Sequence, residues 1–449
     1  MRTKIILGIL AAGILVCGAG CWGTVALVER VVDFRPAAGE LDAAVRDYRA
    51  AGMPWTAKDL APAKPLPPAR NAASLLRRAN AVVLKQGWSG GDRALRDAME
   101  AGRYEDAAAK LDAYAPTLAV FERATAIGTV DFGRDRDLGV NQLFPEFAPM
   151  KSAMKAFGYR ARLRAVRGDL TGARADLRAA RTLARMAESD GVLISMLVRI
   201  SGDAIADDAA QRAAALDPGL ASMLIEDLKR SDRAPDFARA LRSEAYLSLA
   251  TSRNLTGQLA RDSWSGSEGE EKNPTETDPA RLVRDGVPDG LIQRAYLARS
   301  LQVWTRVAGE MRRASDPGQL GNALDRIEDS IGEDRRVSSL LNQILFPIFG
   351  QAGNAVVKDR ASRELTLAYL RALETRRRTG RFPAEPIQGN DPFGRPYVVR
   401  TEGAGFRLYS LGPNGKDDGG LTSVERHVGD PKGDDIVVVF PPPRRRAAP

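Results

Sequence analysis

Oxygen-bearing side chains gather near the end of the chain, in the glycine-rich segment "FRLYSLGPNGKDDGG" at residues 406–420 and in an acidic pair that follows it. Calcium prefers hard oxygen ligands, roughly six to eight of them in a flexible geometry. The glycines let the backbone turn tightly enough to aim carbonyl groups inward. The side chains predicted to bind calcium are Ser410, Asn414, Asp417, Asp418, Asp434 and Asp435. The alternative is a solvated polar turn that holds no metal.

Residue counts argue against other common kinds of site. The chain of 449 residues contains one histidine, His427, and two cysteines, Cys17 and Cys21. A zinc site needs roughly three or four ligands from such residues, and a nucleophilic triad would have to use His427. The carboxylate pairs at 328–329 and 333–334 could support an enzyme of unknown type, but solvated helix ends explain them better. We therefore expect no catalytic residue and no cofactor other than calcium.

The charge pattern does not favour nucleic acid as a partner. The formal net charge is only +9 over the whole chain. Arginine and aspartate alternate along segments such as "RGDLTGARADLRAARTLAR", a pattern typical of solvated helix faces. We therefore expect no nucleic-acid binding.

The N-terminal segment predicts a membrane anchor. Residues 5–28 contain no charged side chain, and that length is sufficient for a helix to span a bilayer. Arg2 and Lys4 precede the segment, which places the N-terminus in the cytoplasm. The remaining chain is then expected on the periplasmic side of the cytoplasmic membrane, held by a single uncleaved span.

A lipid anchor is the alternative for the same segment. Cys21 follows Ala19 and Gly20, as a lipidation site requires, but Gly18 stands where leucine is expected. We favour the interpretation that Cys17 and Cys21 are small apolar residues of a membrane helix. The sequence has no cysteine outside this segment, so the exported part is expected to be stable without disulfides.

The body of the protein is predicted to be a series of amphipathic helices. "AGRYEDAAAKLDAYAPTLAVFERA" (101–124) and "AVRGDLTGARADLRAARTLARMAES" (165–189) each begin with a small-residue turn and continue with apolar residues at helical spacing. Both resemble the turn and second helix of a tetratricopeptide-type hairpin, although no 34-residue period is sustained. A helical-hairpin array and an ordinary helical bundle both fit this pattern.

The last part of the chain changes from helical to strand periodicity. A long helix is predicted from 354 to Gly380, where glycine and a following Pro383 end it. Strands are then predicted at 395–400, 405–411 and 435–440. A long helix followed by a small antiparallel sheet is α+β architecture.

Composition shifts along the chain mark the predicted domain boundaries. A polar stretch rich in serine, glutamate and proline predicts a flexible loop. The predicted units are an anchor (1–30), a short helix with a proline-rich linker (31–70), the helical array (71–261), the loop (262–287), further helices (288–353), the α+β domain (354–443) and a basic tail (444–449).

The α+β segment carries a family resemblance. The motifs "DPFGRPYVVR", "GFRLYSLGPNGKDDGG" and "GDDIVVVF" follow one another after a helix that ends in "TGRFP". Because of these motifs and their order, the segment resembles the C-terminal part of the major pseudopilin of type II secretion systems. The resemblance implies a pseudopilin-like fold and a calcium-binding loop in which Ser410, Asn414 and Asp435 match family positions. The order of anchor, helical pairs and tail also resembles membrane-anchored proteins of Planctomycetes-type bacteria, which implies no activity.

Three functions are compatible with these features. We favour a non-catalytic, membrane-anchored extracytoplasmic scaffold that binds a protein partner through its helical array and ends in a pseudopilin-like module. A pseudopilin-like component of a secretion or envelope apparatus is the second. An enzyme of unknown type is the third, and it rests only on the paired carboxylates.

Overall fold

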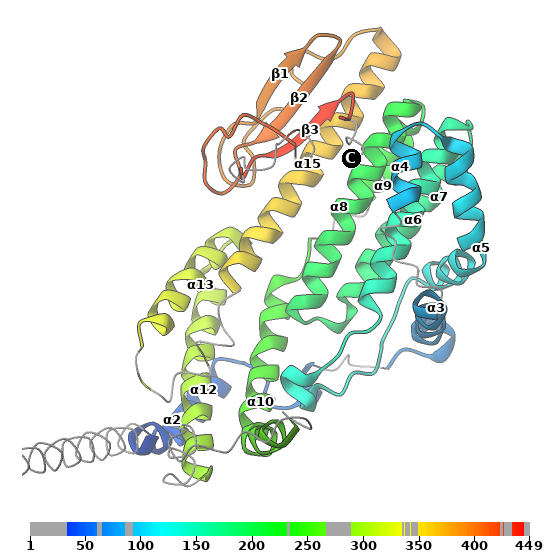
Figure 1. Ribbon diagram of the computed structural model, residues 1–449. Helices are drawn as coiled ribbons and strands as arrows, with labels where there is room; N and C mark the ends of the chain where they lie inside the picture. The colour runs from blue at the N-terminus through cyan, green and yellow to red at the C-terminus, as the bar shows by residue number, and fades with distance from the viewer. Residues whose placement is uncertain are drawn as a thin grey trace, which may run out of the picture.

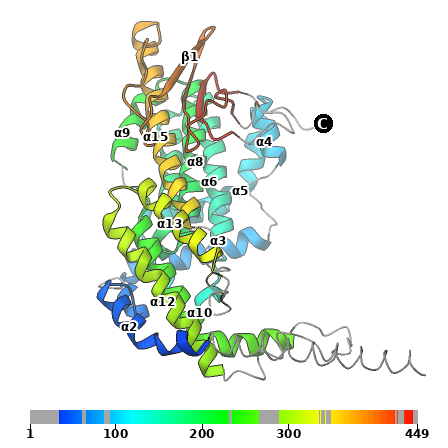
Figure 2. The same cartoon turned by 90° about the vertical axis from the view of Figure 1, so that its left-hand side faces the viewer.

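In the computed structural model the chain is mainly helical, with one small antiparallel sheet near its C-terminal end (Figure 1). The structure describes residues 34–60, 65–85, 93–230, 234–265, 289–334, 336, 342, 349–422, 425 and 433–443. The sheet lies at one end of the molecule and helix α2 (Leu41–Ala50) at the other (Figure 1, Figure 2). The predicted class, mainly helical with a small sheet, is confirmed.

Successive helices pack side by side to form the array. They are α3 (Ala73–Lys85), α4 (Arg93–Glu100), α5 (Tyr104–Ile127), α6 (Phe147–Val166), α7 (Leu170–Ala187), α8 (Leu193–Leu216) and α9 (Leu220–Arg230). The two similar sequence segments share a turn, because Gly102 and Gly168 both adopt a left-handed backbone conformation, with φ of 73° and 75°. In each case the next helix begins two residues later, as the pattern predicted.

A second group of helices forms the other end of the molecule. It contains α10 (Phe237–Ser265), α12 (Asp289–Arg313) and α13 (Pro317–Gly332). Trp304 of α12 is 2% exposed, and its ring meets that of Phe349 edge-on at 5.3 Å. This contact makes Trp304 a packing residue.

Helix α15 (Phe349–Thr379) connects the helical groups to the sheet. Its first half packs against α13, and its second half packs against α8, α9 and the sheet (Figure 1). Leu365, Tyr369 and Leu370 are fully buried in a core that also includes array residues. Gly380 has a φ of 77° and follows the helix directly, as its sequence position predicted.

The sheet has the order β1-β2-β3, with β1 at Val398–Glu402, β2 at Gly405–Ser410 and β3 at Ile436–Phe440. Both pairs are antiparallel, with Val398 opposite Tyr409 and Ser410 opposite Ile436. The three predicted strands are confirmed within a few residues. Phe406 and Phe440 lie beside Tyr369, at centroid distances of 5.7 and 6.1 Å, and fix the sheet on α15.

Several sequence predictions concern residues outside the described part. The anchor, with Cys17 and Cys21, falls in residues 1–33, and His427 and the basic tail are also outside. Among the helices that the structure does describe, none combines the length and the apolar character needed to cross a bilayer. Helix α10 continues through 262–265, the first residues of the predicted loop, and the rest of that loop lies outside the described residues.

The prediction that the alternating arginines and aspartates form solvated faces was wrong for several of these side chains. Asp176 of α7 is 2% exposed, and Arg160 and Arg164 of α6 form ion pairs with it at 2.5 and 3.0 Å. Arg181 is also buried and pairs with Asp207. The alternating charges therefore join neighbouring helices inside the array, because a buried carboxylate needs a cationic partner.

Candidate functional site

The two halves of the predicted calcium site lie side by side. Antiparallel pairing places Ser410 opposite Ile436, so the loop after β2 adjoins the segment before β3. The amide of Gly420 donates to Oδ2 of Asp435 at 2.8 Å. The amide of Asp434 donates to Oδ2 of Asp418, also at 2.8 Å. Strand pairing therefore brings the loop that contains Asp418 beside the segment that contains Asp434 and Asp435.

Ser410 belongs to a buried polar turn that the sequence analysis missed. Its hydroxyl donates to Oδ2 of Asp391 at 2.5 Å, and Asp391 is 4% exposed. The other oxygen of Asp391 accepts from the amides of Phe393 and Arg395. The aspartate before proline in "DPFG" is the sequence signal for such a turn. Asp391 therefore fixes the end of β2 through Ser410.

Protein donors also hold several of the remaining predicted ligands. Asp417 accepts from the hydroxyl of Tyr409 at 3.1 Å and pairs with Arg400 at 2.7 Å. The amide oxygen of Asn414 accepts from the backbone of Lys416. Asp434 pairs with Lys358 of α15 at 2.9 Å. The carboxylate of Asp434 is thus held by α15.

Asp435 differs from the others because its Oδ1 is buried without a hydrogen-bond partner among the described residues. Burial raises the pKa of this carboxyl, the Gly420 amide lowers it, and the charges of Asp418 and Asp417 raise it further. A cation at Oδ1 would relieve these effects. As placed, however, the described part of the chain contains no group of three or more acidic, histidine or cysteine side chains that could hold a metal ion. Of the six predicted side chains, Asp435 thus offers one oxygen that could bind calcium, and the six together do not form a complete coordination sphere.

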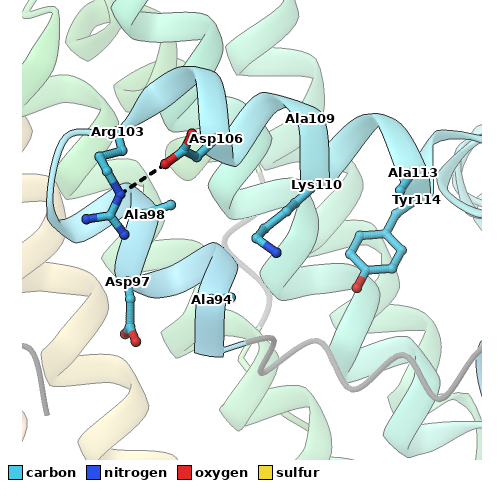
Figure 3. A pocket seen from close by; sticks show the side chains of 9 residues that line it. All are labelled: Ala94, Asp97, Ala98, Arg103, Asp106, Ala109, Lys110, Ala113 and Tyr114. Atoms are coloured by element: carbon cyan, nitrogen blue, oxygen red, sulfur yellow. Dashed lines mark hydrogen bonds and ion pairs between the residues drawn. The ribbon is translucent and has the colours of Figure 1, made fainter.

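An open groove runs between α4 and α5 at the edge of the array (Figure 3). Its volume is about 700 Å³. Ala94 and Ala98 line it from α4, and Ala109 and Ala113 line it from α5. These small side chains leave room for a segment of another chain to approach the helix backbones.

The charged side chains of the groove are not equally compensated. Arg103 pairs with Asp106 at 3.0 Å, and Arg96 donates to Asp97 at 3.1 Å. Lys110 has no carboxylate within ion-pair distance among the described residues, and in Figure 3 its side chain extends toward α4, between Ala94 and Tyr114. The groove thus offers one uncompensated positive charge.

The carboxylates considered for an enzyme have structural contacts. Glu328 accepts from the amides of Phe349 and Gly350, at 2.8 and 3.0 Å, and so provides an acceptor for the first two amides of α15. Asp334 pairs with Arg336 at 2.6 Å. One carboxylate of each pair therefore has a structural contact near a helix end.

A cluster of buried charges lies where α7, α8 and α15 meet, and no local sequence pattern predicted it. Asp203 and Asp207 of α8 lie next to Arg181 and Arg199, which form ion pairs with them. Burial and the nearby carboxylates of α8 raise the pKa of Asp359 on α15 to about 8. This environment favours the protonated, neutral form of Asp359.

No protein-family model, curated protein or solved structure matches this chain.

Proposed function

We propose that the protein is a non-catalytic, membrane-anchored extracytoplasmic scaffold whose helical array binds a protein partner. The groove between α4 and α5 is the observation that carries this proposal (Figure 3). Its alanine-lined walls suit close approach of another chain, and its position at the edge of the array leaves it accessible. The uncharged segment at 5–28 would hold the protein in the cytoplasmic membrane.

The partner that fits the groove is an acidic peptide segment. Lys110 is the one groove cation without a carboxylate partner among the described residues, whereas Arg103 is already paired with Asp106. An aspartate or glutamate of the partner would pair with Lys110, and its small or apolar residues would lie against Ala109 and Ala113. Half-buried Tyr114 would supply apolar area beside this charge.

Site-specific photo-cross-linking in native membranes tests this proposal. A photoreactive residue at Ala109 or Ala113 is expected to capture one partner, and the same residue at Ala115, which is exposed outside the groove, is expected to capture none. The change Lys110→Glu should abolish the cross-link, and Arg123→Glu on the same helix should not. Equal capture from all three positions, or capture unaffected by Lys110→Glu, would exclude the groove as the binding surface.

A pseudopilin-like component of a secretion or envelope apparatus is the second candidate. The packing of three antiparallel strands on the end of long helix α15 favours it. The same cross-linking experiment separates the candidates when photoreactive residues are also placed on β1, at exposed Val399. Capture of secretion components from β1 would favour the second candidate, and capture from the groove alone would favour the first.

We also propose that the C-terminal loop binds calcium through the unpartnered oxygen of Asp435. The adjacent carboxylates of Asp417 and Asp418 would supply further oxygens after a local rearrangement. Asp434 would stay on Lys358 and would not be a ligand, unlike the prediction from sequence.

A further inference from the structure

A second cavity, of about 830 Å³, carries an unusual concentration of positive charge. It lies among the segment after α2, the loop after α5, the end of α7 and the start of α10. Five basic side chains and two acidic side chains line it. They are Lys58, Arg134, Arg136, Arg185, Arg239, Asp131 and Asp190. Its volume is that of a typical small-molecule site.

Three of these arginines have no carboxylate within ion-pair distance in the described part of the chain. Arg136, Arg185 and Arg239 form no ion pair among the described residues, whereas Arg134 pairs with Glu146 and Asp190 at 2.5 and 3.2 Å. This contrasts with the array, where arginines such as those of α6 and α7 pair with carboxylates across helices. The cavity therefore has guanidinium groups available to an anion.

The backbone fixes two of the guanidinium groups side by side. Arg136 donates to the carbonyl of Asp190 and Arg239 to the carbonyl of Ser189, each at 2.8 Å. Burial lowers the pKa of Arg136, Asp190 opposes this effect, and the neighbouring charge of Arg239 lowers that pKa further. The hydroxyl of Ser189 is buried in the same wall and has no partner among the described residues. The two guanidinium groups use backbone carbonyls as acceptors and have no carboxylate within ion-pair distance among the described residues.

We propose that this cavity binds an organic phosphate through Arg136, Arg185 and Arg239. The guanidinium group presents a planar fork of donors that matches phosphate oxygens, and the excess of positive lining charge suits a dianion. Leu60, Leu66 and Met186 line the same cavity and suit an apolar portion of the ligand. The phosphate group can belong to a free small molecule or to the headgroup of an anionic lipid.

Calorimetric titration of the full chain in neutral detergent tests the site. Inorganic phosphate is the probe for a free ligand, and nanodiscs of phosphatidylglycerol, compared with phosphatidylcholine, are the probe for a lipid headgroup. Arg185→Ala is the informative variant, because Arg185 is exposed, donates a hydrogen bond to the hydroxyl of Thr182 and has the charge of Asp203 nearby without an ion pair to it. We expect it to weaken binding about tenfold or more, as loss of a charge-assisted hydrogen bond requires.

Matched variants make the result specific. Arg185→Lys keeps the positive charge but lacks the planar guanidinium group, so its affinity for phosphate should lie between those of the parent and Arg185→Ala. Arg371→Ala removes an exposed arginine of α15 outside the cavity and should change nothing. Binding of phosphate alone would identify a free ligand, and binding of phosphatidylglycerol nanodiscs alone would identify a lipid. Absence of binding with both probes, or equal binding by the parent and Arg185→Ala, would overturn the proposal.

Discussion

At the scale of residues, charge is used inside the array as well as on its surface. Asp176 and Asp207 are almost completely buried, and each is paired with arginine from a neighbouring helix. Arginine and aspartate alternate in the sequence, but the same alternation is typical of a solvated helix face and of buried ion pairs between helices. Only the packing of α6, α7 and α8 decides which charges are enclosed. This is why the sequence predicted the helices and not their ion pairs.

Asp359 gives a prediction on pH dependence. Its pKa in the folded protein is raised to about 8 by burial and by the carboxylates of Asp203 and Asp207. The folded state therefore binds this proton more tightly than the unfolded chain. The stability that it contributes is fully present below the ordinary aspartate pKa of about 4 and is lost as pH rises through about 8.

The variant Asp359→Asn removes this dependence because asparagine does not ionise. We expect it to unfold at a higher temperature than the parent at alkaline pH, by an amount equivalent to about 1 kcal/mol or more, and at nearly the same temperature at acidic pH. Thermal unfolding followed by circular dichroism across this range measures the difference. Asp112→Asn, at an exposed position of α5, is the matched control. A constant difference between parent and variant at all pH values would contradict the assignment.

At the scale of elements, strand periodicity and turn residues predicted the sheet well. Alternating apolar residues and glycine turns are local signals, and β1, β2 and β3 lie where these signals placed them. Helix α15 begins at Phe349, earlier than the predicted 354, because Glu328 of α13 accepts its first amides. A cap supplied by another helix leaves no mark in the local sequence. The role of Asp391 was missed for a related reason, since its partner Ser410 lies 19 positions away.

The loop after β2 gives the prediction for calcium. If the cation binds Oδ1 of Asp435, it stabilises the native state only, by about 2.7 kcal/mol at a hundredfold excess over its dissociation constant. The full chain should then melt at a higher temperature in calcium than in chelator. Asp435→Asn should abolish the shift. Asp434→Asn should preserve it, because Lys358 holds that carboxylate. Equal melting of the parent in both buffers would leave the segment a polar turn stabilised by protein hydrogen bonds.

At the scale of the whole molecule, α15 joins parts that the sequence analysis separated. Residues of α15 share one buried cluster with α7, α8 and α9 on one side and with β2 and β3 on the other. Phe406 and Leu408 of the sheet belong to the same cluster as Leu220 and Leu224 of the array. Long-range packing of this kind depends on shape, which the period of apolar residues does not specify. Helix α15 and the sheet are therefore packed onto the array through one shared core.

The proposed membrane anchor gives a prediction about where the protein is found in the cell. The segment 5–28 is long enough to span a bilayer, and each arginine placed at the centre of such a helix costs about 2.5–3.5 kcal/mol on insertion. We expect Ile14→Arg with Val16→Arg to release the protein from the membrane fraction, and Ile14→Leu with Val16→Ile to retain it. Cys17→Ala with Cys21→Ala should also be retained, because a spanning helix needs no lipid. Fractionation followed by immunoblotting measures each variant. Release of the cysteine variant would establish a lipid anchor in place of the membrane-spanning helix. Retention of the arginine variant would show that other parts of the chain bind the protein to the membrane.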